Sequence, residues 1–195
     1  MFKPQPVALQ QGALRLDPLT EADLPGLLQL AEANRASQQF MSGTTRPDWY
    51  RSALAEQREG REVVFAIRLA GELVGTTSFF DFNLVLPAAE IGATWLDVGQ
   101  HGTGLNRMIK YLMLRHAFEE WQLVRVQLKT AASNLRAQRA IEKLGAQREG
   151  LLRNHRRLAD GRLDHTVMYS ITDSEWPQVK AGPVSYTHLT LPTSD

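Results

Sequence analysis

The stretch His101-Gly102-Thr103-Gly104-Leu105-Asn106 decides how this chain is interpreted. It follows a strand-like run over residues 91–97 and opens a helix-like run over residues 105–120. A glycine turn between a strand and a helix exposes backbone N–H groups at the positive end of the helix dipole, which favours binding of a phosphate or pyrophosphate. The glycines also let a ligand approach without meeting a Cβ atom. The alternative is a turn that bends the chain and binds nothing.

The spacing of this turn excludes two nucleotide-binding motifs. The stretch lacks the Gly-Lys-Ser/Thr ending of a P-loop and the third glycine of a dinucleotide-binding fingerprint. No strand–helix–strand unit precedes it early in the chain, so it lies too late to open a Rossmann domain.

The composition is typical of a soluble globular protein. A length of 195 residues suits one domain, and the contents of 43% hydrophobic and 22% charged residues are ordinary. No apolar run reaches the ~18–20 residues that span a bilayer, and the N-terminus has no apolar signal core. We therefore expect a cytoplasmic protein with no membrane partner. The absence of cysteine excludes disulfides and a cysteine nucleophile, and the scattered histidines predict no metal site.

Positive charge gathers in residues 121–165, although the net charge of the chain is +1. The segment holds ten Lys and Arg residues against four acids. A basic segment next to a phosphate-binding turn fits a polyphosphate cofactor, and solvated arginines on an exposed helix and hairpin are the alternative. A nucleic-acid partner is not expected, because no aromatic stacking pattern accompanies the arginines.

Hydrophobic periodicity and turn signals divide the chain into strands and helices. Residues 1–12 resemble a loose lead-in. The expected strands cover residues 14–19, 62–69, 72–81, 90–97, 123–130, 146–157 and 165–171. The expected helices cover residues 20–34, 47–59, 105–120 and 134–144.

These elements predict a single domain over residues 1–182. The remaining residues, 183–195, are rich in Ser, Thr and Pro and resemble translated read-through of a sequencing adapter. We expect this tail to be non-native or disordered, and a genuine flexible tail is the alternative.

The order of the elements resembles the GNAT acyltransferase fold over roughly residues 10–172. The pyrophosphate motif of that family, Arg/Gln-x-x-Gly-x-Gly/Ala, falls on residues 101–106. Gly104 matches the motif, whereas His101 stands in place of Arg or Gln and Asn106 in place of the final small residue.

A second motif supports the same resemblance. The family has an Asn followed at +3 by Ala or Ser and at +11 by Gly, and this chain has Asn134, Ala137 and Gly145. Residues 145–153 then resemble the RimJ/RimL branch, which includes protein N-terminal acetyltransferases.

The resemblance implies an α+β fold, an α/β/α sandwich. Its mixed, mostly antiparallel sheet would splay between the fourth and fifth strands, which are residues 90–97 and 123–130. It also implies that acetyl-CoA is the cofactor and that a backbone N–H of Trp95, Leu96 or Asp97 binds the thioester carbonyl. The other residues implied to hold the cofactor are His101, Gly102, Thr103, Gly104, Leu105 and Asn106 at the pyrophosphate and Asn134 at the pantetheine arm.

The implied activity is direct acetyl transfer to a primary amine in a ternary complex, with a carboxylate as base. Burial raises the pKa of a carboxylate toward the working range. The resemblance to RimL-type enzymes favours Glu149, which could instead pair with Arg148 or Arg153. Glu90 is the second candidate and could instead be a surface acid at a strand end. Asp97 is the third.

The chain departs from the family where a proton donor is expected. The position seven residues after the motif Asn, often Tyr, is Ile141, and the position at +3, Ser in RimL-type enzymes, is Ala137. Water or Tyr111 would have to substitute. A non-catalytic CoA-binding or interaction protein on the GNAT fold is therefore the alternative function.

The acceptor is expected to be a protein N-terminus or a small amine or amino acid. Trp49 is a candidate for the wall of the acceptor site, because the second helix lines the acceptor groove in the family. The final hairpin is a candidate interface for a homodimer.

Overall fold

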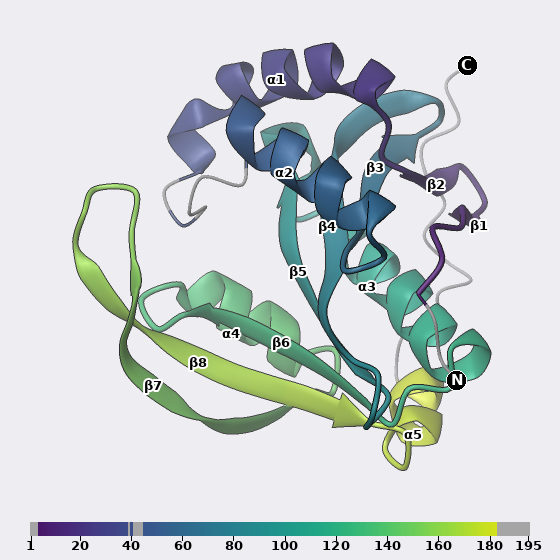
Figure 1. Ribbon diagram of the computed structural model, residues 1–195. Coiled ribbons are helices and arrows are strands. Elements are labelled where there is room, and N and C mark those ends of the chain that lie inside the picture. Colours follow the sequence, from purple (N-terminus) through teal and green to yellow (C-terminus); the bar gives the residue numbers. More distant parts are fainter. Residues whose placement is uncertain (1–3, 39, 41–44, 183–195) are drawn as a thin grey trace.

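The computed structural model describes residues 4–38, 40 and 45–182 of the chain (Figure 1). The tail predicted over residues 183–195 lies outside this range. Within the described residues, one eight-stranded sheet has the order β1-β2-β3-β4-β5-β6-β8-β7. The strands are β1 Leu9–Gln11, β2 Leu14–Pro18, β3 Val63–Leu69, β4 Glu72–Asn83, β5 Ala88–Leu96, β6 Arg125–Ala131, β7 Gln147–Arg157 and β8 Leu163–Thr172. Strands β5 and β6 are parallel, and the other neighbours are antiparallel. The prediction of a mixed, mostly antiparallel sheet is confirmed.

Helices cover both faces of this sheet. Helices α1 Leu24–Ala33 and α2 Pro47–Arg58 lie on one face, and α3 Leu105–Arg115 lies on the other (Figure 1). The alternation of strand β3 explains the two layers, because Val64 packs with the α1–α2 cluster while Phe65 packs with the α3 cluster. Helices α4 Leu135–Glu142 and α5 Trp176–Ala181 complete the α-helices of the described residues.

The splay predicted between the fourth and fifth strands is present between β5 and β6. Their pairing covers Ala88–Glu90 opposite Arg125–Gln127 and stops there, and Figure 1 shows the two strands diverging beyond it. Strand β5 also carries a bulge, because Gly92 pairs with Ser78 but Trp95 pairs with Thr76. The extra residue in β5 changes which side chains face each layer.

The structure differs from the predicted elements at three places. The predicted lead-in contains β1, which pairs with β2 through a tight turn at Gly12 (φ 56°). The helix predicted to end at residue 120 leaves α-helical geometry after Arg115 and closes with a π-helical turn, His116–Glu120. Helix α5 was not predicted, because its six residues are too short for a clear period. No helix in the described part of the chain is long and apolar enough to cross a membrane.

Candidate active site

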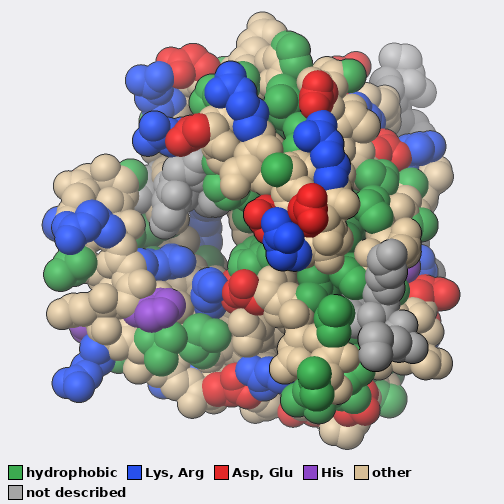
Figure 2. Space-filling view, in the orientation of Figure 1, with side chains coloured by type: hydrophobic (Ala, Val, Ile, Leu, Met, Phe, Trp, Pro, Cys, Tyr) green, Lys and Arg blue, Asp and Glu red, His purple; other side chains and the backbone are tan. Residues whose placement is uncertain are grey.

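A cavity of about 1080 Å³ follows the splay between β5 and β6. Its walls come from both layers, since Trp49 on α2 and Lys110 on α3 both line it. Figure 2 shows the surface hollowed between the β7–β8 hairpin and the rest of the molecule. The sheet therefore has an opening at the place where a ligand on one face could meet a ligand on the other.

The glycine turn forms one end of this cavity. Gly102 (φ 81°) and Gly104 (φ 88°) both have left-handed backbone angles, and Gly104 is the N-cap of α3. The Thr103 hydroxyl accepts the N–H of Leu105 at 3.3 Å. Within the described residues, the N–H groups of Gly102, Thr103 and Gly104 make no hydrogen bond. The turn thus presents free donors at a helix N-terminus, which suits an anion.

Basic side chains surround the same turn. Arg107, Arg136 and Lys143 all line the cavity. The Nε of Arg107 is buried and has no partner among the described residues, although its Nη2 donates to the carbonyl of Lys143 at 3.4 Å. Arg136 Nη1 lies 3.3 Å from Nδ1 of His101. A buried guanidinium N–H without an acceptor, next to free backbone donors, fits the pyrophosphate of coenzyme A.

Asn134 is positioned as the sequence predicted, at the start of α4. Its Oδ1 accepts the N–H of Ala137 at 3.1 Å and caps the helix. Its Nδ2 has no partner among the described residues and is available to a ligand in the cavity that Asn134 lines. Asn106, Ala137 and Ile141 line the same cavity, so the two expected proton-donor positions present apolar side chains to it.

The three backbone candidates at the end of β5 are not equivalent. The N–H of Asp97 donates to the Val74 carbonyl at 2.8 Å and is therefore occupied. The Trp95 carbonyl faces β4, because a Cβ atom on Gly75 would lie 2.1 Å from it. Backbone groups alternate along a strand, so the N–H of Leu96 points away from β4 and toward the splay.

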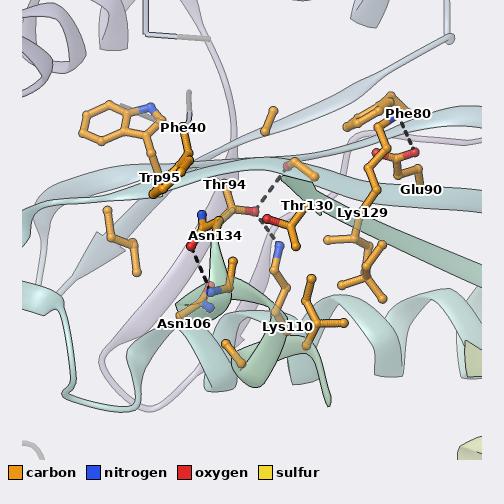
Figure 3. Close-up of a pocket in the computed structure, with 18 of the residues that line it drawn as sticks. Phe40, Phe80, Glu90, Thr94, Trp95, Asn106, Lys110, Lys129, Thr130 and Asn134 are labelled. Atoms are coloured by element: carbon orange, nitrogen blue, oxygen red, sulfur yellow. Dashed lines mark hydrogen bonds and ion pairs between the residues drawn. The ribbon is translucent and has the colours of Figure 1, made fainter. Parts of the chain in front are cut away.

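Glu90 lies inside the cavity. Its side chain is 1% exposed. Its Oε2 accepts a hydrogen bond from Gln127 Nε2 at 2.9 Å. The same oxygen forms an ion pair with Lys129 Nζ at 2.9 Å (Figure 3). Within the described residues Oε1 has no donor, and it lies over Gly92, where a Cβ atom would be 3.3 Å from it. Burial raises the pKa of Glu90, and Lys129 opposes this effect.

Glu149 lies on β7 and is not among the residues that line the cavity. Both of its carboxylate oxygens accept from Arg125, at 2.5 and 2.6 Å, and Ser170 donates to Oε1 at 2.8 Å. The hydrogen bonds from Arg125 lower the pKa of Glu149 to about 2. Glu149 therefore forms an ion pair, as the alternative interpretation of the sequence expected, but its partner is Arg125 and not Arg148 or Arg153.

Aromatic side chains also line the cavity. Trp49, the candidate for the wall of the acceptor site, is among them, together with Phe40 and Phe80. Tyr111, considered as a proton donor, instead packs on Trp176 at 5.9 Å between ring centroids and does not line the cavity.

Two cavity residues were missed by the sequence reasoning. Burial lowers the pKa of Lys110 to about 7 and raises the pKa of Glu62 to about 7. The signal for Lys110 was a lone cation on the buried face of the helix, between Ile109 and Leu112. Glu62 precedes the apolar run of β3, where a strand-end acid is usually exposed.

Known proteins share this architecture. Residues 13–147 match the acetyltransferase (GNAT) domain family. A "putative acetyltransferase" from T. thermophilus is 37% identical, with a TM-score of 0.78 over 90% of this chain and 94% of that one. RimJ of Mycobacterium smegmatis, in complex with a CoA disulfide, is 25% identical, with a TM-score of 0.81 over 91% and 93%.

A curated relative agrees with these structures. "Probable N-acetyltransferase YjcK" of Bacillus subtilis is 29% identical over 77% of this chain and 90% of its own length. The family match covers more than half of the chain, and the cavity has the donors that coenzyme A requires. The chain therefore belongs to the GNAT acetyltransferase family, as an N-acetyltransferase that uses acetyl-CoA.

Proposed function

We propose that this protein transfers the acetyl group of acetyl-CoA directly to a primary amine, with Glu90 as the base. The observation that carries the proposal is the carboxylate of Glu90, buried at the splay with one oxygen free. Direct transfer needs both substrates in one cavity, and this cavity joins the two faces of the sheet.

The cofactor end of the site is assigned from the available donors. The N–H groups of Gly102, Thr103 and Gly104, together with Arg107, would hold the pyrophosphate. Asn134 Nδ2 would hold the pantetheine arm. The N–H of Leu96 would donate to the thioester carbonyl and stabilise the oxyanion that forms there. When bound, acetyl-CoA supplies an acetyl group activated as a thioester.

The base has to take a proton from the acceptor ammonium before the nitrogen can attack. Glu90 suits this task because burial raises its pKa above that of a free carboxyl. Gln127 and Lys129 hold its Oε2 and leave Oε1, which lies over the cavity-lining Gly92, as the oxygen that can accept the proton. Glu149 suits it less, because Arg125 keeps it ionised with a pKa of about 2. We therefore place Glu90 before Glu149, reversing the order that the resemblance suggested.

The acceptor class rests on the other end of the cavity. Burial raises the pKa of Glu62, which lines the cavity, to about 7. Phe40, Trp49 and Phe80 give the cavity apolar surface. A primary amine next to an apolar or small side chain fits this combination. The RimJ/RimL resemblance makes a protein N-terminus the first candidate, and a small amine or amino acid is the second. We further propose that residues 1–182 form a single catalytic domain.

The test has two steps. Calorimetric titration of acetyl-CoA, with ATP and NAD as controls, should show selective binding. Release of coenzyme A should then depend on an added amine, measured across peptides with varied N-termini and small amines. Thiol release that does not respond to any amine would contradict the proposal.

The alternative is a CoA-binding protein without catalysis. It is favoured by the apolar side chains of Ala137 and Ile141 on the cavity wall. It predicts tight binding of acetyl-CoA in the first step and no amine-dependent release in the second.

A further inference from the structure

Lys110 is a buried cation without a counter-ion. Its side chain is 6% exposed on α3. Its Nζ donates to the hydroxyl of Thr94 and lies 3.5 Å from that of Thr77. No carboxylate of the described residues lies within ion-pair distance of it. Burying an unpaired ammonium costs several kcal/mol, so such a group is rare unless an anion reaches it.

The position of Lys110 indicates where that anion would come from. Figure 3 shows Lys110 pointing from α3 toward Thr94, at the bulge of β5. The bulge lies next to Leu96, whose N–H faces the splay. Ala137 and Ile141 of α4 line the same cavity and supply no charge. Lys110 is therefore a cation that reaches this segment of β5 from α3, whereas Lys129, which lines the same cavity, is paired with Glu90.

The pyrophosphate is not the anion that Lys110 is placed to meet. Lys110 follows the N-cap Gly104 by six residues, which is about 9 Å along a helix axis. The turn has its own cations in Arg107, Arg136 and Lys143. The remaining anion of the reaction is the thiolate that leaves when the thioester is cleaved.

We propose that Lys110 is the catalytic residue that donates a proton to the departing coenzyme A thiolate. Glu90 first accepts a proton from the acceptor ammonium. The amine nitrogen then forms a bond to the carbonyl carbon, and the C–S bond breaks with its electron pair on sulfur. The Lys110 ammonium gives its proton to that sulfur. Its neutral amine regains one from the newly acylated nitrogen, so one proton is released overall, from Glu90.

The environment of Lys110 suits this exchange. Burial lowers its pKa to about 7, so that both giving and regaining a proton are accessible near neutral pH, and the negative charge of Glu90 on β5 opposes the shift. The groups that contact it are the hydroxyls of Thr77 on β4 and Thr94 on β5. A thiol such as that of free Cys has a pKa of about 8.5, so the two groups are matched within about two units.

The first test measures the bound thiol and not turnover. The ultraviolet absorbance of the coenzyme A thiolate is titrated with pH in the wild type and in Lys110→Met, with desulfo-coenzyme A as the blank. An ammonium within ~4–6 Å lowers the pKa of an acid by roughly 1–3 units, so the wild type should bind a thiol of lower pKa than Lys110→Met does. Measuring the thiol pKa in the Glu90→Gln background, with and without Lys110→Met, removes the contribution of the Glu90 carboxylate to that pKa. Equal thiol titrations in the wild type and Lys110→Met would overturn the proposal.

The second test separates proton donation from a structural role. Lys110→Met should lower kcat by ~10²–10⁴-fold, the usual contribution of a general acid, with little change in the affinity for acetyl-CoA. Thr77→Val is the matched control, because it removes a hydroxyl from the same cluster and keeps the ammonium, and it should lose far less. Equal losses in the two variants would indicate that Lys110 only positions the bulge.

Lys110→Arg keeps the test decisive if Lys110→Met does not fold. A guanidinium keeps the charge but does not release its proton, since its pKa exceeds 12. The thiol pKa should then stay low while turnover falls, and full turnover in Lys110→Arg would refute proton donation. The inference rests on the proposed function. A wild type that binds acetyl-CoA without amine-dependent turnover would remove that function, whereas an active wild type with an unchanged Lys110→Met would remove only the role of Lys110.

Discussion

Replacing Glu90 by Gln should abolish most of the catalytic rate and leave the fold intact. Glutamine keeps the size of the side chain, and its amide oxygen can still accept from Gln127 and Lys129. The nitrogen of that amide then replaces Oε1, the oxygen that has no donor among the described residues and lies over Gly92. The substitution therefore removes the proton acceptor and the negative charge that pairs with Lys129.

The magnitude follows from the role. Loss of a general base lowers kcat by ~10²–10⁴-fold, which is about 2.7–5.4 kcal/mol at 1.36 kcal/mol per tenfold. Burial raises the pKa of Glu90 above that of a free carboxyl. Only the ionised form acts as a base, so the wild-type rate should rise with pH through this raised pKa, and the acidic limb should be missing in Glu90→Gln.

The assay is coenzyme A release at saturating amine, with kcat followed across pH and acetyl-CoA binding measured by calorimetry. Glu149→Gln is the matched control. It removes a carboxylate that lies outside the cavity and pairs with Arg125, and the loss of a partly exposed ion pair costs at most ~1 kcal/mol of stability. A Glu90→Gln enzyme within about threefold of the wild-type rate, beside an inactive Glu149→Gln, would refute this reasoning and restore the order that the RimL resemblance suggested.

Three further predictions concern binding and stability. Arg107→Met should weaken acetyl-CoA binding by about 10–100-fold, because a charge-assisted hydrogen bond contributes roughly 1.5–3 kcal/mol, and calorimetry that shows unchanged affinity would contradict the phosphate assignment. Glu62 titrates near 7 in the folded chain and near 4.5 when unfolded, so the unfolded state binds fewer protons and stability should fall as pH rises from about 4.5 to 7. In Glu62→Gln the melting temperature should no longer fall with pH over this range. An unchanged fall would mean that another group titrates there. Gly75→Ala should destabilise the fold by more than ~2 kcal/mol in urea unfolding, because its Cβ atom would lie 2.1 Å from the Trp95 carbonyl at a φ of 153°; a neutral effect would contradict the register of β4 and β5.

The layered fold was accessible from the sequence because its signals are local. Gly104 and Asn134 mark the starts of α3 and α4 through their own backbone and side-chain chemistry, and the strands follow from alternation. The register between strands is not local. Glu149 and Glu90 both lie in strand-like runs. Nothing within either run indicates that Arg125 of β6 binds Glu149, or that Glu90 is the last residue of β5 to pair with β6 before the splay. Lys110 was missed for the same reason, because its partners lie 16 and 33 residues away.

The bulge in β5 accounts for the separation of the two proposed proton-transfer groups. In an uninterrupted strand, side chains at positions 90 and 94 would point to the same face. The extra residue between Gly92 and Trp95 reverses this relation, so Glu90 shares the α1–α2 face with Trp95 while Thr94 turns toward Lys110 on α3. With the base and the acid on opposite faces of the sheet, the base can take the proton of the amine while the acid protonates the sulfur. The separation keeps the two groups from forming an ion pair with each other. Glu90 and Lys110 form no ion pair in the described structure, and the charge of Glu90 acts on Lys110 only by raising its pKa.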